Sequence, residues 1–407
     1  MSSPTGSLLA NKRFKTGLEA LLERHLPATF PALSLCVIHR GDIALDGAWG
    51  WIDPETRGLP VDADTLFDLA SVTKIFVETS FLTLVEAGKI ALEDRLLAVI
   101  PEFAQLNPRE ISGGQDPHTR QFLPIDGDYD ELSVDVTAVR FKHLLTHTSG
   151  LPPWRSVYLL ASEEAPAPPA YGSACEETRW QRGLAGMLRF PFAGPVGEAV
   201  RYTDIGIMLL GEAVSRLHGV RLDKALANLI LDPLNLRSPT YNPVQNGIPR
   251  EKTVPTEYDK TWRRRRAWGE VHDENACGLG GIAGHAGLFA TARDVAAFGN
   301  AWVSGDNRLR LSAQLRKDAT SQQASGQFRM GLGWMLKAAG DSSAGELYSH
   351  SSYGHTGFTG TSLWVDPIRH LVTAVLTNRV FHGRHAENIH SFRRSIHDLV
   401  VRGIEGR

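Results

Sequence analysis

The sequence has few cysteines, no export signal and no membrane-spanning run. Its 407 residues include three cysteines, Cys36, Cys175 and Cys277, and no Cys-x-x-Cys pair. This odd number argues against a disulfide framework and fits a reducing compartment. Residues 2–16 lack the apolar core of a signal peptide, and no run of about 18 apolar residues occurs. We therefore expect a cytoplasmic protein without a membrane partner.

A marked excess of either charge is also absent. Lysine and arginine total 43 against 45 aspartate and glutamate, a formal charge of −2. Such a balance provides no general attraction to nucleic acid, so a nucleic-acid partner is not expected. The strong basic run Arg263–Arg266 stands without a wider basic field, and we interpret it as a solvated loop.

Hydrophobic periodicity predicts strands near both ends of the chain and helices between them. Strands are expected at 33–38, 43–45, 331–336, 362–365 and 371–377, and helices at 14–25, 140–147, 204–217, 222–231, 292–303 and 386–401. Two stretches, 107–135 and 151–177, are predicted to be long loops and are expected to select the substrate.

This order predicts an α/β (α+β) fold, in which both termini build one antiparallel sheet flanked by helices. A mainly helical domain is inserted between them. The expected division is 1–66 with 326–407 for the sheet domain and 67–325 for the helical domain.

One short motif has a clear chemical meaning. Ser71 stands before the apolar helical pattern of residues 75–85, and Lys74 follows it by three residues. Residues three apart share a helix face, so the amine can lie beside the hydroxyl and help to activate it as a nucleophile. Because Ser-x-x-Lys occurs by chance about once in a chain of this length, its significance depends on partners elsewhere.

Two later motifs supply such partners, in a specific order. Arg201-Tyr202-Thr203-Asp204 precedes one predicted helix, and Gly354-His355-Thr356-Gly357-Phe358 begins a strand-like run. Ser-x-x-Lys, a Tyr-x-Asn-like motif and a Lys-Thr-Gly-like motif in this order resemble the serine β-lactamases and penicillin-binding proteins. The tyrosine form of the second motif is similar to the class C branch with its esterase and D-peptidase relatives. The resemblance covers about residues 30 to 380.

The resemblance implies the roles of the site residues. Ser71 would form an acyl-enzyme, and Lys74 and Tyr202 would share its proton, with either of them as the base. Asp204 would hold Lys74. The backbone N–H groups of Ser71 and Phe358 would form the oxyanion hole, beside the supporting residues His355, Thr356 and Gly357. No metal or other cofactor is implied.

Two positions depart from the family pattern. Asp204 replaces the usual asparagine, which favours a protonated Lys74 and points to Tyr202 as the base. His355 replaces the lysine of Lys-Thr-Gly, and a mostly neutral imidazole grips a substrate carboxylate more weakly than an ammonium does. Uncharged esters or amides become the favoured substrates.

Rival signals have plainer explanations. The glycine-rich stretch 278–283 imitates a dinucleotide fingerprint, but it follows a polar segment instead of a strand. The segment 272–274 and the pair His143 and His147 offer metal-ligand types without a metal-binding pattern. His285 has no assigned role. The absence of Gly-x-Ser-x-Gly excludes an α/β-hydrolase elbow.

The sequence thus predicts a serine hydrolase, a β-lactamase-like esterase whose partner is a small-molecule ester, amide or peptide substrate. The alternatives are a D-alanyl-D-alanine carboxypeptidase or class C-like β-lactamase, and, in another class, a non-catalytic binding or scaffold protein of the same fold.

Overall fold

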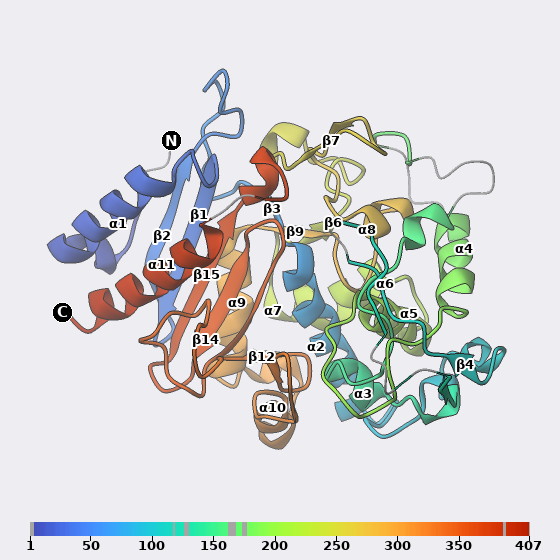
Figure 1. Ribbon diagram of the computed structural model, residues 1–407. Coiled ribbons are helices and arrows are strands. Elements are labelled where there is room, and N and C mark those ends of the chain that lie inside the picture. Colours follow the sequence, from blue (N-terminus) through green and yellow to red (C-terminus); the bar gives the residue numbers. More distant parts are fainter. Residues whose placement is uncertain are drawn as a thin grey trace.

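The computed structural model describes residues 4–116, 119–125, 129, 131–161, 168–172, 177–385 and 388–406. Its main feature is an eight-stranded antiparallel sheet. In spatial order the strands are β10 (Ala324–Ser325), β11 (Arg329–Met330), β12 (Met335–Leu336), β13 (Tyr353–Thr356), β14 (Ser362–Asp366), β15 (Leu371–Thr377), β1 (Ala32–His39) and β2 (Asp42–Gly50). The prediction of one sheet built from both ends of the chain is confirmed (Figure 1).

The sheet is covered on both faces. The helices α1 (Lys12–His25) and α11 (Ile389–Ile404) pack together on one face, and α9 (Ala292–Val303) packs on β1, β14 and β15 from the other (Figure 1). Successive side chains of a strand point to opposite faces. In β1, Leu35 and Val37 accordingly join the core under α1 and α11, whereas Cys36 and Ile38 join the larger core on the other side.

Most of the remaining chain forms the helical part. Its helices are α2 (Thr73–Glu86), α3 (Phe141–Leu145), α4 (Glu177–Met187), α5 (Asp204–His218), α6 (Leu222–Leu226), α7 (Asp232–Leu234), α8 (Glu274–Gly278) and α10 (Ala313–Ala319). A small sheet joins β3 (Phe67–Asp68), β9 (Leu288–Ala290) and β6 (Thr240–Tyr241). Two ladders pair β4 (Arg109–Glu110) with β5 (Ser133–Val134) and β7 (Tyr258–Asp259) with β8 (Arg265–Arg266).

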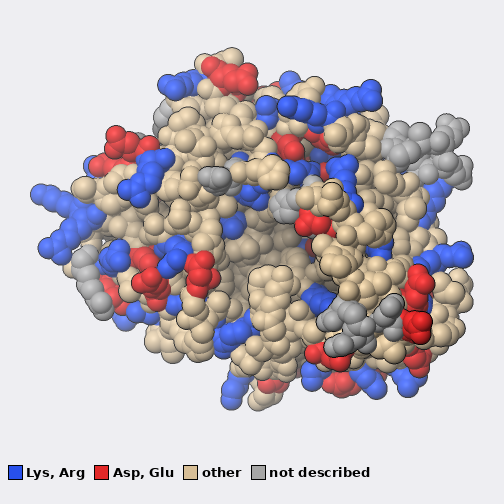
Figure 2. All heavy atoms as spheres, in the orientation of Figure 1, with Lys and Arg blue, Asp and Glu red and all other residues tan. Residues whose placement is uncertain are grey.

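The two parts meet around the N-terminal end of α2, and the space-filling view shows a hollow in the middle of this face (Figure 2). The division at residues 66 and 326 stays a prediction. Helix α9 lies within the segment 67–325, yet it packs on the terminal sheet. No helix among the described residues has both the length and the apolar character that a membrane crossing requires.

Several predicted elements need correction. Residues 331–336 do not form one strand, because Gly333 has a φ of +87° and the Gly331 N–H donates to the Trp334 carbonyl, which closes a turn between β11 and β12. The helix predicted over 222–231 continues past α6 as a π-helical turn, Ala227–Leu231. Within the predicted loop 107–135, β4 and β5 pair, and parts of both predicted loops lie outside the described residues.

Candidate active site

Ser71 lies in a tight turn that a buried carboxylate holds in place. The turn is a 3₁₀ segment, Ala70–Val72, that runs directly into α2. Ala70 has a φ of +46°, a left-handed conformation that residues with a side chain rarely adopt. Asp68 supports it by accepting hydrogen bonds from the N–H groups of Ala70 (2.8 Å) and His272 (2.6 Å). Strain of this kind persists where surrounding contacts impose it, as they often do at functional sites.

Lys74 is fully buried at the first turn of α2. Its Nζ donates to Ser71 Oγ (2.8 Å) and to the His285 carbonyl (3.1 Å), and it lies 2.7 Å from Asp204 Oδ1. The first two contacts are hydrogen bonds, and the third is an ion pair with the Asp204 carboxylate. Burial is the largest single effect on the pKa of Lys74 and lowers it, but Asp204 and Tyr202 together outweigh burial and raise that pKa above its usual value. Lys74 is therefore a cation at neutral pH.

Tyr202 lies beside this ammonium. Lys74 Nζ is 4.9 Å from the centre of the phenol ring. Burial raises the pKa of Tyr202 to about 12, although the positive charge of Lys74 acts in the opposite direction. At neutral pH the resting site thus contains a protonated lysine and an uncharged phenol, and neither is a free base.

His147 packs against Tyr202 and was not assigned to the site by sequence reasoning. The Thr203 N–H donates to His147 Nδ1 (3.1 Å), and the imidazole and phenol ring centres are 4.5 Å apart. Burial, together with the charge of Lys74, lowers the pKa of His147 well below its usual value. His143 instead accepts a hydrogen bond from the Arg140 N–H. The two histidines are therefore held separately and do not form the metal pair considered from their spacing.

The third motif ends β13 and approaches Tyr202 from the sheet. His355 Nδ1 donates to the Thr356 carbonyl (2.9 Å), so Nε2 has the lone pair, and this nitrogen lies 3.5 Å from the Tyr202 hydroxyl. Burial and the charge of Lys74 lower the pKa of His355 to about 3. The imidazole is neutral, as its replacement of a lysine led us to expect.

The turn that follows β13 is fastened to the backbone just before Ser71. Thr359 Oγ1 donates to the Asp68 carbonyl (2.7 Å), and Thr361 Oγ1 donates to the Leu69 carbonyl (2.8 Å). A Cβ on Gly357 would overlap the Leu69 carbonyl oxygen, so glycine permits this close approach. Phe358 and Ser71 consequently line one cavity of about 180 Å³. The use of their backbone N–H groups as an oxyanion hole stays a prediction.

Another part of the wall of this cavity is a network of charged and polar groups. His285 Nε2 is 2.9 Å from Asp273 Oδ1, and His272 Nε2 is 2.8 Å from Glu257 Oε2. Arg384 pairs with both Glu257 and Glu274. Sequence reasoning left His285 and the segment 272–274 without roles, and the network shows how they build this wall.

Comparison with known proteins agrees with this geometry. Residues 20–395 match the family model described as Beta-lactamase. The chain belongs to the beta-lactamase family. A relative from Escherichia coli (strain K12), named "Putative D-alanyl-D-alanine carboxypeptidase", is 28% identical over 386 residues, which cover 89% of this chain and 81% of that protein.

Solved structures of low sequence identity share the β-lactamase-family fold. The structure titled "EstCE1, a hydrolase with promiscuous acyltransferase activity" aligns with a TM-score of 0.70 at 16% identity, covering 96% of this chain and 99% of its own. A penicillin-binding protein homolog from Caulobacter crescentus aligns with a TM-score of 0.69 at 19% identity, covering 99% and 100%. The antiparallel, helix-flanked fold predicted from the sequence is confirmed.

A group of possible metal ligands also lies in this β-lactamase-family site. Oxygen and nitrogen atoms of Asp204, Asp273 and His285 lie within 4.8 Å of one another. The Lys74 ammonium, however, already contacts Asp204 and the His285 carbonyl. The Lys74 ammonium thus already supplies the positive charge at this position, and we assign no metal to it.

The basic run 263–266 is not the solvated loop that we expected. Arg263 is buried, donating to the Asp273 carbonyl (3.1 Å) and to Cys277 Sγ (3.4 Å). Arg265 forms an ion pair with Glu270, and Arg264 is exposed. The run therefore supports the segment behind the cavity wall, a role that depends on contacts a charge count cannot reveal.

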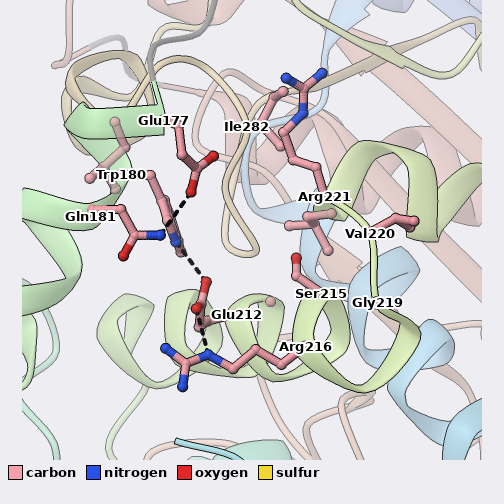
Figure 3. A pocket seen from close by; sticks show the side chains of 13 residues that line it. Glu177, Trp180, Gln181, Glu212, Ser215, Arg216, Gly219, Val220, Arg221 and Ile282 are labelled. Carbon is pink, nitrogen blue, oxygen red and sulfur yellow. Dashed lines mark hydrogen bonds and ion pairs between the residues drawn. The ribbon is translucent and has the colours of Figure 1, made fainter. Parts of the chain in front are cut away.

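A larger cavity, of about 360 Å³, lies between α4 and α5 and does not include Ser71 among its lining residues (Figure 3). Its polar groups largely bond to one another. Trp180 Nε1 donates to Glu212 Oε2 (2.6 Å), Arg216 Nε donates to Glu212 Oε1 (2.7 Å), and Gln181 donates to Glu177 (2.8 Å). We therefore place the candidate active site at the smaller cavity beside Ser71.

Proposed function

We propose that the protein is a serine hydrolase that cleaves an ester or amide through an acyl-enzyme on Ser71. The observation that carries the proposal is the hydrogen bond of 2.8 Å from Lys74 Nζ to Ser71 Oγ, within a cavity that Tyr202 and Phe358 also line. The ammonium beside Ser71 favours the ionised form of Tyr202, which can accept the serine proton, and backbone N–H groups at the cavity can stabilise the developing oxyanion.

The chemistry follows from the resting charges. The Lys74 ammonium favours the tyrosinate form of Tyr202, and that minor form accepts the Ser71 proton as Oγ bonds to the substrate carbonyl carbon. The N–H groups of Ser71 and Phe358 bind the oxyanion. Tyr202 then gives its proton to the leaving group as the bond to it breaks. Tyr202 next takes a proton from a water molecule as the water oxygen bonds to the acyl carbon, and it returns that proton to Ser71 Oγ as the bond between the acyl group and the serine breaks. Because the uncharged phenol dominates at neutral pH, the rate should rise with pH.

An uncharged ester or amide is the favoured substrate class, because the third motif carries a neutral imidazole. His355 is buried, and its pKa is lowered to about 3 by burial and by Lys74. It therefore adds no positive charge to attract a substrate carboxylate at the pH of the cell.

A D-alanyl-type carboxypeptidase is the second candidate, and Arg393 favours it. This buried arginine donates to the carbonyls of Gly357 (2.8 Å) and Thr361 (2.7 Å), and it forms no ion pair with any described carboxylate. Arg393 and Thr356 also line one cavity of about 450 Å³ next to the third motif. A positive charge there suits a carboxylate-bearing substrate, and the relative from Escherichia coli bears a carboxypeptidase name.

The two candidates separate on matched substrates. We would compare hydrolysis of p-nitrophenyl butyrate, nitrocefin, an acyl-D-Ala-D-Ala peptide and the same peptide with an amidated C-terminus. Ser71→Ala should abolish turnover, whereas the control Ser80→Ala, on the same helix with its hydroxyl bonded to the Phe76 carbonyl, should retain it. Preference for the ester and indifference to the peptide carboxylate supports the esterase. Strong preference for the free carboxylate supports the carboxypeptidase.

Failure of a fluorophosphonate probe to label Ser71 would contradict both candidates. The remaining candidate would then be a non-catalytic binding protein of the same fold.

A further inference from the structure

Glu78 is a buried carboxyl that the proposed reaction does not use. It lies on α2 one turn after Lys74, and 2% of its surface is exposed. Neither carboxyl oxygen has a hydrogen-bond partner among the described residues. Burying a polar group without a partner is costly, and such groups are rare in native proteins. A carboxyl in this position therefore calls for an explanation.

The backbone opposite Glu78 is shaped to accommodate the carboxyl. Gly333 has a φ of +87°, and a Cβ at this position would lie 2.7 Å from Glu78 Oε2. The Gly333 N–H donates to the Leu145 carbonyl (2.8 Å), which fixes the turn between β11 and β12 against the end of α3. The space for the carboxyl is thus part of the fold.

Lys74 is the charged group that acts on Glu78. Residues four apart share a helix face, but no hydrogen bond joins either Glu78 carboxyl oxygen to Lys74 or to any other described residue. Lys74 therefore influences Glu78 through space without bonding to it. The other titratable groups around Lys74 are Asp204, Tyr202, His147 and His355, and the turn residues 332–334 add no charge.

We propose that Glu78 is a positioning residue that acts through Lys74: as an uncharged acid it leaves the ammonium balanced by Asp204 alone, and its ionisation suppresses the activation of Ser71. This inference rests on the proposed function. With Glu78 neutral, Lys74 and Asp204 form a balanced pair beside Tyr202. An ionised Glu78 would add a second negative charge nearby, which opposes loss of a proton from Tyr202 and Ser71.

The pH range of this effect follows from the burial of Glu78. Burial raises its pKa to about 8, with the charge of Lys74 acting in the opposite direction. Glu78 is therefore protonated at neutral pH and ionises in mildly alkaline solution. Ser71 lies seven residues before Glu78, about two helical turns or about 10 Å, and at an effective dielectric constant of about 20 one charge at that distance changes a proton equilibrium by roughly tenfold.

The test is the rate at which a fluorophosphonate probe labels Ser71, from about pH 6 to about pH 10. This rate reports activation of the serine without knowledge of the natural substrate. We expect the wild-type rate to rise with pH and then to flatten or fall above about pH 8. In Glu78→Gln the rate should continue to rise, so that the variant exceeds the wild type by roughly tenfold or more at the alkaline end.

Two further variants and one spectrum make the outcome decisive. Glu78→Met should reproduce the altered profile without an amide, whereas Glu86→Gln, which replaces an acid near the other end of α2, should follow the wild type.

An infrared band of a protonated carboxyl should be present in the wild type at neutral pH, disappear as pH rises, and be absent from Glu78→Gln. Superimposable profiles for the wild type and both Glu78 variants would overturn the proposal.

A result that contradicts the proposed function differs from one that contradicts only the role of Glu78. Absence of labelling in every variant at every pH would contradict the reaction at Ser71, and with it any role of Glu78 in that reaction. The infrared band would still report the charge of Glu78. If labelling is normal and the band is missing at neutral pH, Glu78 is ionised in the resting protein and the proposal is refuted.

Discussion

Replacing Glu78 should stabilise the protein, and the gain should depend on pH. The pKa of Glu78 rises from an ordinary 4.5 to about 8 on folding because the carboxyl is buried. Between these two values the unfolded chain has lost the proton and the folded protein retains it. Stability therefore falls as pH rises through this window, by about 1.4 kcal/mol per pH unit. At pH 7 the loss attributable to Glu78 amounts to about 3 kcal/mol.

Glu78→Gln removes this titration, so the difference between variant and wild type isolates it. We would measure the free energy of unfolding of both proteins by urea titration at several pH values from about 5 to about 8. The stability of the variant relative to the wild type should increase by about 1.4 kcal/mol per pH unit, independently of any constant effect of the new amide. A difference that does not change with pH would refute the argument, since it would mean that Glu78 titrates alike in the folded and unfolded states.

Three further substitutions test the rest of the site. Asp204→Asn removes the charge that keeps the neighbouring ammonium protonated, so the pH profile of fluorophosphonate labelling should move to lower pH; an unmoved profile contradicts this. Gly357→Ala places a Cβ against the Leu69 carbonyl and should lower kcat for ester hydrolysis about 100-fold, whereas Gly340→Ala, with open space around it, should not; equal activities would exclude the close approach as a requirement. His355→Lys should raise kcat/KM for carboxylate-bearing substrates relative to neutral esters by roughly tenfold, and an unchanged ratio would show that this position does not tune charge preference.

The sequence was sufficient to predict the fold class and to name Lys74 and Tyr202 as side chains that lie beside Ser71. Motif order carries this information, because Ser71, Tyr202 and His355 come from three distant segments that share a cavity or contact one another. Local periodicity gave a wrong prediction where a glycine changes the chain direction. At Gly333 the single predicted strand is instead two short strands, β11 and β12, joined by a turn.

Residues whose roles depend on tertiary contacts were harder to foresee. Arg263 belongs to a basic run that looks solvated, and burial against Cys277 is a property of the folded chain alone. His147 accepts a hydrogen bond from the Thr203 N–H, and its ring packs against the Tyr202 ring. The four-residue spacing between His143 and His147 does not indicate either contact. A signal for Glu78 was present, since it is an acidic residue within an apolar helix, four positions after Lys74.

The resting charges explain why these less visible residues matter to the chemistry. Burial keeps Tyr202, His147, His355 and Glu78 uncharged at neutral pH, and Lys74 and Asp204 form the ion pair among them. No described group beside Ser71 is a strong base at rest, so the proposed reaction depends on how easily a proton leaves Tyr202, and every nearby charge alters that equilibrium. An asparagine in place of Asp204 would leave the ammonium without its carboxylate and draw Glu78 towards ionisation. In the proposed reaction the acid at position 204 and the neutral acid at position 78 act together through Lys74, and their combined charge would set the pH at which Ser71 is activated.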